Sequence, residues 1–418
     1  MTLRFAGTLW RLLGVPALVL LCLQGCATPS RNHAVPPHLS VTASVVGFSA
    51  TDKIRYHPRD AGDSRLLEQE FVDSWERERA YLELNPQTGA LPPASFLSIS
   101  GGGDNGAYGA GFLNGWTKAG TRPQFKFVTG VSTGALIAPF AFLGPAYDDV
   151  LKAMYTGVSP RDIAIERHFY SVFFDDAMAD TTPLRNLLKH QVTQKLLDAV
   201  AMEYQKGRLL FIGTTNLDAR RPVLWNITKI AASHRPEALE LVLEILRASA
   251  AIPGEFPPVM IRVEAGGQTY EEMHVDGSAT MQMFVYWTGV QLEQLATEHG
   301  AQRERKIYMI RNARLDPEWA EVERRTLPIT FRAISTLVQY QGLGDLFRIY
   351  WVSQRDGIDF NLAYIPETFK TLHKQPFDTE YMRSLYDVGY GQAEAGYKWA
   401  KRPPLLANED VSSSTPSP

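Results

Sequence analysis

The sequence predicts an α/β fold with a mostly parallel central sheet, and two observations support this prediction. Short apolar segments alternate with segments of helical periodicity between Phe96 and about Asn312. Two of the apolar segments run into glycine-rich turns that open helices rich in small residues. The expected strands are residues 96–100, 125–129, 209–214, 223–227, 273–275 and 306–310.

Helical periodicity and helix signals place the remaining elements. Thr181-Thr182-Pro183 resembles a helix cap with proline in the first turn, and leucines then recur at helical spacing as far as Leu196. A charged helix with one apolar side precedes the first strand, and two long helical stretches follow the last one. The expected helices are residues 65–84, 106–119, 135–143, 184–196, 236–250, 329–354 and 379–399.

The N-terminus is typical of a secretion signal. Arg4 and Arg11 precede an apolar run, residues 12–23, that is too short to span a bilayer. The run ends in Leu23-Gln24-Gly25-Cys26, which resembles a bacterial lipobox. We therefore expect a signal peptide over residues 1–25 and lipidation of Cys26. By resemblance to Gram-negative lipoproteins, Ala27 favours the outer membrane, facing either the periplasm or the cell surface.

Composition narrows the possible partners. The net charge is −3, and about −5 once the two signal arginines are removed, so the sequence favours neither nucleic-acid binding nor a polybasic membrane clamp. Of the two cysteines, Cys22 and Cys26, only Cys26 would remain, and a mature chain without disulfides fits an exported lipoprotein.

The chain is expected to divide into five parts. Residues 26–92 read as a tether and N-terminal helical arm, 93–312 as the catalytic domain, and 313–401 as a C-terminal helical region. Residues 402–418 are rich in proline and serine, which predicts a disordered tail.

A nucleophile elbow is predicted at Gly130-Val131-Ser132-Thr133-Gly134. A G-x-S-x-G pattern alone is often an ordinary turn, but here an apolar strand precedes it and a helix follows it. Gly130 and Gly134 leave room for a tight turn that exposes the Ser132 hydroxyl. The positive end of the following helix favours negative charge at this point.

A second glycine-rich turn, Gly101-Gly102-Gly103, lies between the preceding strand and helix. Consecutive backbone N–H groups in such a turn can point at one oxygen and stabilise an oxyanion. The alternative is a dinucleotide loop, because Gly106 completes the G-x-G-x-x-G pattern. Residues 121–124 offer no acidic residue for a ribose, so the oxyanion interpretation is favoured.

The candidate base is Asp276, which with Gly277 follows the strand at 273–275. A carboxylate at the carboxyl end of a strand lies where open α/β sheets place their active sites. Asp-Gly alone is more often a plain turn.

These three motifs, in this order, resemble those of the patatin-like phospholipases. The resemblance extends over about residues 96–286 and includes the segments 180–184, 214–218, 248–253 and 256–258. It implies a patatin-like three-layer fold with N- and C-terminal helical extensions. It also implies hydrolysis of fatty acyl esters of phospholipids or related lipids through an acyl-enzyme, without a metal or another cofactor.

The resemblance assigns Ser132 as nucleophile and Asp276 as base of a Ser–Asp dyad. It places the oxyanion hole in the loop of Gly101, Gly102, Gly103 and Asp104. Many members carry Arg or Lys where this chain has Asn105, so the chain brings no charge there to assist catalysis or to attract an anionic headgroup.

Other candidates and one rival function remain open. His274, on the same strand face as Asp276, is expected to be a polar residue that lines the site without a direct role, because a dyad needs no histidine. Asp175, Asp176 and Asp180 are expected in a solvated loop rather than at a metal. The aromatic cluster Phe169, Tyr170, Phe173 and Phe174 could line an acyl pocket, form a lid, or be ordinary core.

The rival function is a non-catalytic, lipid-anchored binding or envelope assembly protein on the same fold.

Overall fold

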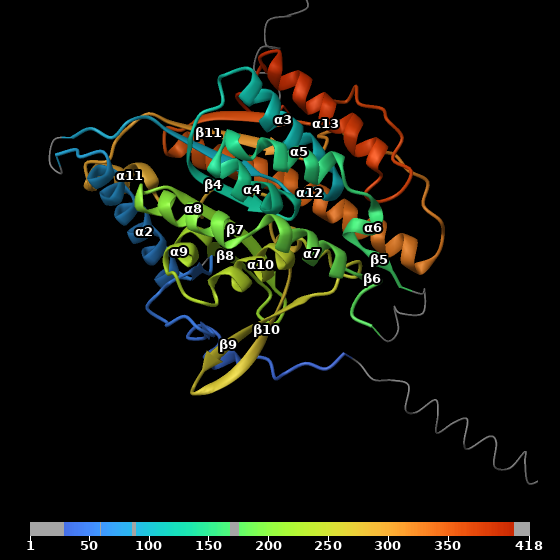
Figure 1. Cartoon of the computed structure of the whole chain (residues 1–418), viewed down its shortest axis with the longest axis horizontal. Helices are drawn as coiled ribbons and strands as arrows, with labels where there is room; N and C mark the ends of the chain where they lie inside the picture. Colours follow the sequence, from blue (N-terminus) through green and yellow to red (C-terminus); the bar gives the residue numbers. More distant parts are fainter. Residues whose placement is uncertain (1–28, 59, 86–88, 168–174, 405–418) are drawn as a thin grey trace, which may run out of the picture.

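A ten-stranded sheet forms the centre of the molecule (Figure 1). The computed structural model describes residues 29–58, 60–85, 89–167 and 175–404. The strand order is β1-β9-β10-β7-β4-β3-β11-β12, and β8 pairs with both β7 and β2. The strands are β1 (Ser44–Val45), β2 (Arg55–Tyr56), β3 (Ala94–Ile99), β4 (Phe125–Val131), β7 (Leu209–Asn216), β8 (Arg221–Asn226), β9 (Val259–Ala265), β10 (Gln268–Asp276), β11 (Arg305–Arg311) and β12 (Asp359–Tyr364).

The centre of this sheet is parallel, as predicted. Strands β7, β4, β3, β11 and β12 are parallel neighbours, whereas β10, β9, β8, β2 and β1 extend one side in antiparallel pairings. All six expected strands are present, with ends shifted by a few residues. The α/β fold class with a mostly parallel central sheet is therefore confirmed.

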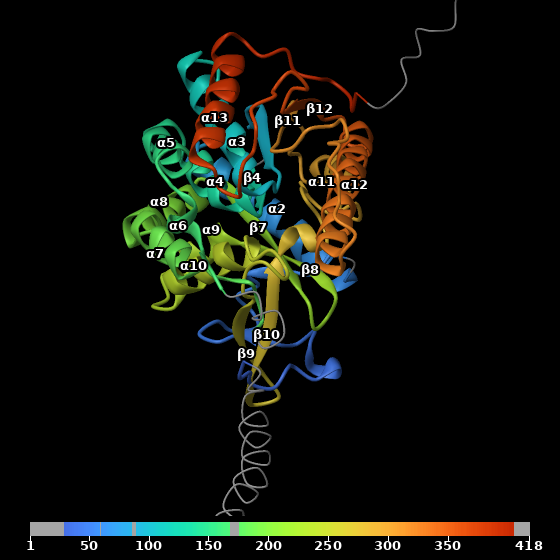
Figure 2. The same ribbon diagram turned by 90° about the vertical axis from the view of Figure 1, so that its right-hand side faces the viewer.

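Helices cover both faces of the sheet (Figure 2). One hydrophobic core lies under α3, α4, α5, α8, α10 and α13, and a second lies under α2, α11 and α12. The helices of the first face are α3 (Gly106–Lys118), α4 (Thr133–Leu143), α5 (Asp148–Thr156), α8 (Gln194–Gln205), α10 (Ala238–Ser249) and α13 (Thr379–Glu394). Those of the second face are α2 (Ala61–Tyr81), α11 (Leu292–Glu298) and α12 (Thr326–Arg355).

The central strands are apolar because both of their faces are buried. In β7, Leu209 and Phe211 belong to the core beneath α2, whereas Leu210 and Ile212 belong to the core on the opposite face. Side chains of a strand alternate between faces, so a strand covered on both sides reads as a continuous apolar run. This burial makes 125–131 and 209–216 easy to recognise in the sequence.

Two expectations about the helices need correction. The predicted helix 184–196 is two helices, α7 (Thr182–Gln191) and α8, because the Thr193 side chain caps the second by accepting a hydrogen bond from the Leu196 N–H. The region 313–401 is not purely helical, because β12 pairs with β11 at the edge of the central sheet. The polar residues of Asp359–Tyr364 gave no apolar run to identify this strand.

The N-terminal arm contributes more than a tether and a helix. Strands β1 and β2 pair with β9 and β8, so this segment extends the antiparallel side of the sheet. The predicted signal peptide with Cys26, the aromatic residues 169, 170, 173 and 174, and the tail beyond residue 404 lie outside the described residues. No helix among the described residues has the length and apolarity needed to span a membrane.

Candidate active site

The predicted elbow is a strained turn between β4 and α4. Ser132 has φ 55° and ψ −128°, a conformation that a residue with a side chain adopts only when its surroundings impose it. A Cβ on Gly130 would lie 2.4 Å from the Gly134 carbonyl oxygen, and one on Gly134 would lie 2.3 Å from the Ile99 oxygen. Both elbow glycines are therefore required by close packing of backbone on backbone.

The register of the sheet brings Asp276 to Ser132. Strand β10 runs antiparallel to β7, with Asp276 opposite Thr214, and Val131 of β4 lies opposite Gly213. Adjacent residues of β7 thus hold the last residue of β10 and the elbow side by side. The Ser132 Oγ donates a 2.6 Å hydrogen bond to Asp276 Oδ2, and both residues are buried.

Asp276 was expected near the site because it ends a strand, but that reason was incomplete. Its strand is antiparallel, so the rule for the carboxyl ends of parallel strands does not apply to it. The contact depends instead on Gly277. A Cβ there would lie 2.5 Å from the Gly213 oxygen, so glycine lets the chain turn against β7.

The surroundings of Asp276 shift the pKa of its carboxyl group in the direction that suits a base. Burial raises its pKa from 3.8 to about 6, against the lowering effect of hydrogen bonds from Ser132 and Ser278. The Ser278 backbone N–H donates to Oδ1 at 2.7 Å, which leaves Oδ2 facing the serine. A carboxylate with a pKa near 6 is ionised at neutral pH and accepts a proton more readily than an exposed one.

The glycine loop carries free backbone donors beside the serine. Within the described chain, the N–H groups of Gly102, Gly103 and Asp104 have no hydrogen-bond acceptor. Gly103 has φ 58°, in the left-handed region, and a Cβ on Gly102 would lie 2.2 Å from the Asn312 carbonyl oxygen. The loop therefore needs glycine at both positions, and its free donors suit an oxyanion.

Gly101, also placed in the oxyanion hole from the sequence, does not fit that role. Its N–H donates to the Gln282 carbonyl at 3.1 Å, so it is already used. A Cβ at this position would lie 3.1 Å from the Ser132 Cβ and 2.6 Å from the Ser278 Oγ. Gly101 instead provides the space in which the dyad sits against the loop.

Two polar residues that the sequence did not reveal hold this arrangement. Ser249, at the end of α10, accepts the Ser132 N–H at 3.0 Å and donates to the Gly213 carbonyl at 2.7 Å. Asn312 donates to the hydroxyl and the carbonyl of Ser100 from its backbone and side-chain amides. Both are buried. Ser249 lies in the segment 248–253 that carries the family resemblance, whereas Asn312 is marked in the sequence only by its position after an apolar strand.

His274 lies away from the dyad. Its Nδ1 contacts Thr214 Oγ1 at 2.9 Å and its Nε2 contacts Glu272 Oε2 at 3.1 Å, within a buried network that includes Arg55. The side chain is 0% exposed, and burial lowers its pKa. His274 therefore joins neighbouring strands rather than lining the substrate site.

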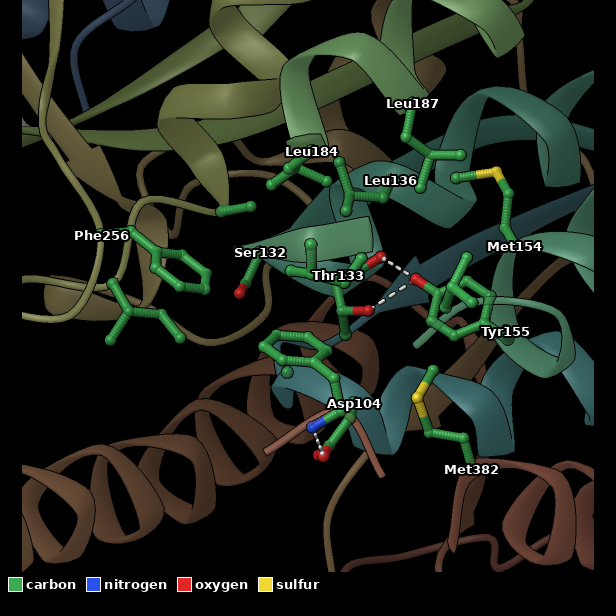
Figure 3. Close-up of a pocket in the computed structure, with 16 residues that line it drawn as sticks. Asp104, Ser132, Thr133, Leu136, Met154, Tyr155, Leu184, Leu187, Phe256 and Met382 are labelled. Carbon is green, nitrogen blue, oxygen red and sulfur yellow. Dashed lines mark hydrogen bonds between the residues drawn. The ribbon is translucent and has the colours of Figure 1, made fainter. Parts of the chain in front are cut away.

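An apolar cavity of about 50 Å³ opens beside Ser132 (Figure 3). Leu136, Leu184 and Leu187 lie on one side of it, and Asp104 and Met382 lie on the other. The remaining wall is formed mainly by Met154, Tyr155, Val158, Ile163, Ile252, Phe256 and Phe377. This apolar lining suits the hydrocarbon part of a substrate whose ester reaches the serine.

The acidic residues after the elbow helix pair with nearby groups of the chain. Asp175 and Asp176 face Arg167 at 3.9 and 3.6 Å, and Asp180 caps α7 by accepting from the Thr182 N–H at 2.8 Å. Among the described residues, no group of three or more His, Cys, Asp or Glu could hold a metal ion.

Several solved structures are distantly similar to this chain. VipD from Legionella pneumophila is 11% identical, covers 72% of this chain and 66% of its own, and has a TM-score of 0.34. ExoU of the Pseudomonas aeruginosa type III secretion system is 14% identical, with coverage of 73% and 52% and a TM-score of 0.31. Human GIVD cytosolic phospholipase A2 is 9% identical, with coverage of 75% and 55% and a TM-score of 0.30.

This chain thus spans between about half and two thirds of the length of these structures, and similarities at this level carry no inference about its activity. No curated protein matches the sequence. The family model described as patatin-like phospholipase matches residues 97–285, which contain the glycine loop, the elbow and Asp276. Residues 97–285 therefore form a domain of the patatin-like phospholipase family, a family of lipid acyl hydrolases.

Proposed function

We propose that this protein hydrolyses fatty acyl esters of membrane phospholipids or related lipids through an acyl-enzyme on Ser132. The observation that carries the proposal is the 2.6 Å hydrogen bond from Ser132 to a buried carboxylate, beside an apolar cavity and a loop of free N–H donors. The groups that would serve as nucleophile, base, oxyanion site and acyl site thus lie together, which supports the proposal.

In the acylation step, Ser132 Oγ attacks the ester carbonyl carbon while its proton moves to Asp276 Oδ2. The carbonyl oxygen becomes an oxyanion, for which the N–H groups of Gly102 and Gly103 are available. Collapse of this intermediate breaks the bond to the alcohol. The protonated Asp276 gives its proton to the departing alkoxide, so the headgroup-bearing product leaves as an alcohol.

In the deacylation step, a water molecule takes the place of the alcohol. Asp276, again ionised, accepts a proton from the water as its oxygen attacks the acyl carbon. The second oxyanion meets the same backbone donors. When it collapses, the proton returns to Ser132 Oγ and the fatty acid is released, which restores the starting state without a metal or a histidine.

Exposed apolar side chains near the site support a substrate presented in a lipid surface. The segment 319–340, which contains the first half of α12, exposes Trp319 (88%), Leu337 (71%) and Tyr340 (65%). Phe331 of the same helix approaches Gly254, next to residues that line the acyl cavity. Apolar patches of this kind commonly mark membrane or protein contacts.

We also propose that Cys26 carries lipid and anchors the protein in the bacterial envelope at the outer membrane. The support is the sequence alone, in which a signal-like apolar run ends in Leu23-Gln24-Gly25-Cys26. Cys26→Ser should leave the protein in the soluble fraction of the producing cells, whereas the wild type should be found with the membranes. Equal distribution of the two would contradict the anchor.

The activity is tested by fatty-acid release from vesicles of mixed phospholipids. We expect release by the wild type and none above background from Ser132→Ala. Ser249→Ala provides a graded control, because it removes a hydrogen bond that positions the nucleophile and should reduce turnover without abolishing it. A folded wild type that releases no fatty acid from phospholipid, lysophospholipid or neutral ester would favour the rival binding function.

A further inference from the structure

A second cavity lies on the other side of the oxyanion loop. It has a volume of about 400 Å³, is open to solvent, and lies between the loop, the chain that follows β11 and the exposed half of α12. Its walls include Gly102, Asn105, Gln282, Arg314 and Arg332. The lining is polar, in contrast to that of the acyl cavity on the Ser132 side.

Two arginines and one carboxylate, Glu318, line the cavity, and among the described residues one of these arginines has no carboxylate partner. The carboxylates of Asp316 and Glu318 both lie within 4 Å of Arg314, which also donates to the Phe369 carbonyl. Arg332 donates to the Glu318 backbone carbonyl and has no carboxylate within 4 Å among the described residues. Arg314 thus has carboxylate partners, whereas Arg332 has none among the described residues.

Arg311 lies beneath the same cavity. It is 0% exposed, and its Nη2 and Nε donate to two lining residues, Gln339 at 3.2 Å and the Arg314 carbonyl oxygen at 3.5 Å. Its Nη1 has no hydrogen-bond partner, and no carboxylate in the described chain pairs with it. The carboxylate of Asp345, which influences Arg311 from a distance, is paired with Arg348.

A buried guanidinium without a counter-ion is unfavourable unless an anion completes its surroundings. We propose that this cavity binds the phosphate of a glycerophospholipid headgroup, with Arg332 as its direct partner and Arg311 adding positive potential from below. The inference rests on the proposed function and names its substrate class. The loop that separates the cavities would place an ester at Ser132, with its acyl chain on one side and its phosphate on the other.

This subsite also bears on Asn105, where many family members carry a basic residue. Asn105 lines the phosphate cavity, and its Oδ1 accepts a hydrogen bond from Tyr381 at 2.6 Å. The charge absent from the loop is thus supplied across the same cavity, from β11 and α12. Neutral lipid esters such as diacylglycerol have no phosphate, so these arginines would not strengthen their binding.

The experiment compares kcat/KM for phosphatidylglycerol and for diacylglycerol with the same acyl chains, both in micelles of a neutral detergent. For Arg332→Gln we expect the phosphatidylglycerol-to-diacylglycerol ratio to fall about ten-fold, because a charge-assisted hydrogen bond is lost. Ser335→Glu, which places a carboxylate on the cavity wall, should lower the ratio further. Arg324→Gln removes the same charge from an exposed position outside the cavity and should leave the ratio unchanged.

The outcomes separate this inference from the proposed function. A wild type that hydrolyses both lipids, with a ratio that Arg332→Gln and Ser335→Glu leave unchanged, overturns the phosphate subsite but not the hydrolase. An equal fall in Arg324→Gln also overturns it, because general surface charge would then explain the effect. A wild type that hydrolyses neither lipid nor a soluble short-chain ester removes the proposed function, and the subsite with it.

Discussion

Replacement of Asp276 by Asn should abolish activity and, at the same time, stabilise the protein at neutral pH. The amide can satisfy the groups that surround the carboxylate. Its oxygen can accept the Ser278 N–H, now 2.7 Å from Oδ1, and its NH₂ can donate to Ser132 Oγ. The amide cannot accept the proton of the Ser132 hydroxyl, so kcat should fall by about 10³-fold.

The stability change follows from the raised pKa. A carboxyl group whose pKa rises from 3.8 in the unfolded chain to about 6 in the fold prefers its protonated form there. The stability that it contributes is present below pH 3.8 and is lost as the pH rises through 6. At about 1.4 kcal/mol per pH unit, the buried charge costs about 3 kcal/mol at pH 8. The amide of the Asp276→Asn variant carries no charge, so this cost is absent.

Urea unfolding of both proteins between pH 4.5 and pH 8 measures the difference. The free energy of unfolding of Asp276→Asn, relative to the wild type, should increase by about 2 kcal/mol over this range. The kcat/KM of the wild type should rise over the same range and level off above pH 6, because the base must be ionised. A stability difference that does not change with pH would refute the buried, high-pKa carboxylate.

Three further predictions concern residues around the dyad. His274→Ala should retain most activity but lower the free energy of unfolding by about 1–3 kcal/mol, because it removes the buried imidazole and its hydrogen bonds to Thr214 and Glu272; a loss of turnover as large as that of Asp276→Asn would contradict the dyad. Leu187→Trp, on the wall of the acyl cavity, should shift the preference toward shorter acyl chains in a series of chain lengths, and an unchanged profile would place the acyl chain elsewhere. Leu337 is 71% exposed, and Leu337→Glu should reduce hydrolysis of phospholipid in vesicles but not hydrolysis of a soluble ester. An equal reduction of both activities would argue against a contact between this side chain and the lipid surface.

Much of the fold and the two glycine-rich turns of the candidate site could be predicted because they depend on local signals. The elbow and the glycine loop each follow a buried strand, so apolar runs and glycine spacing identify both of them. Strand β12 could not be predicted in this way, because half of its residues are polar and its partner β11 lies about fifty residues away.

Hydrogen bonds between segments that are distant in the sequence determine the roles of several site residues, and the sequence alone does not reveal these bonds. In the sequence the N–H of Gly101 is equivalent to those of its neighbours, and only the fold places the Gln282 carbonyl against it. Ser249 is an ordinary helix residue in the sequence, and becomes important only because α10 ends beside the elbow. The contact between Asp276 and Ser132 likewise depends on the register of two antiparallel strands, which no motif records.

Fluorophosphonate labelling of the purified protein, with identification of the modified residue by mass spectrometry, tests the central claim most directly. We predict one label, on Ser132, which is absent from Ser132→Ala and strongly slowed in Asp276→Asn, because the reaction needs both an activated serine and its base. A folded wild type that does not react, or that reacts at another residue, would contradict the assignment of Ser132 as the nucleophile.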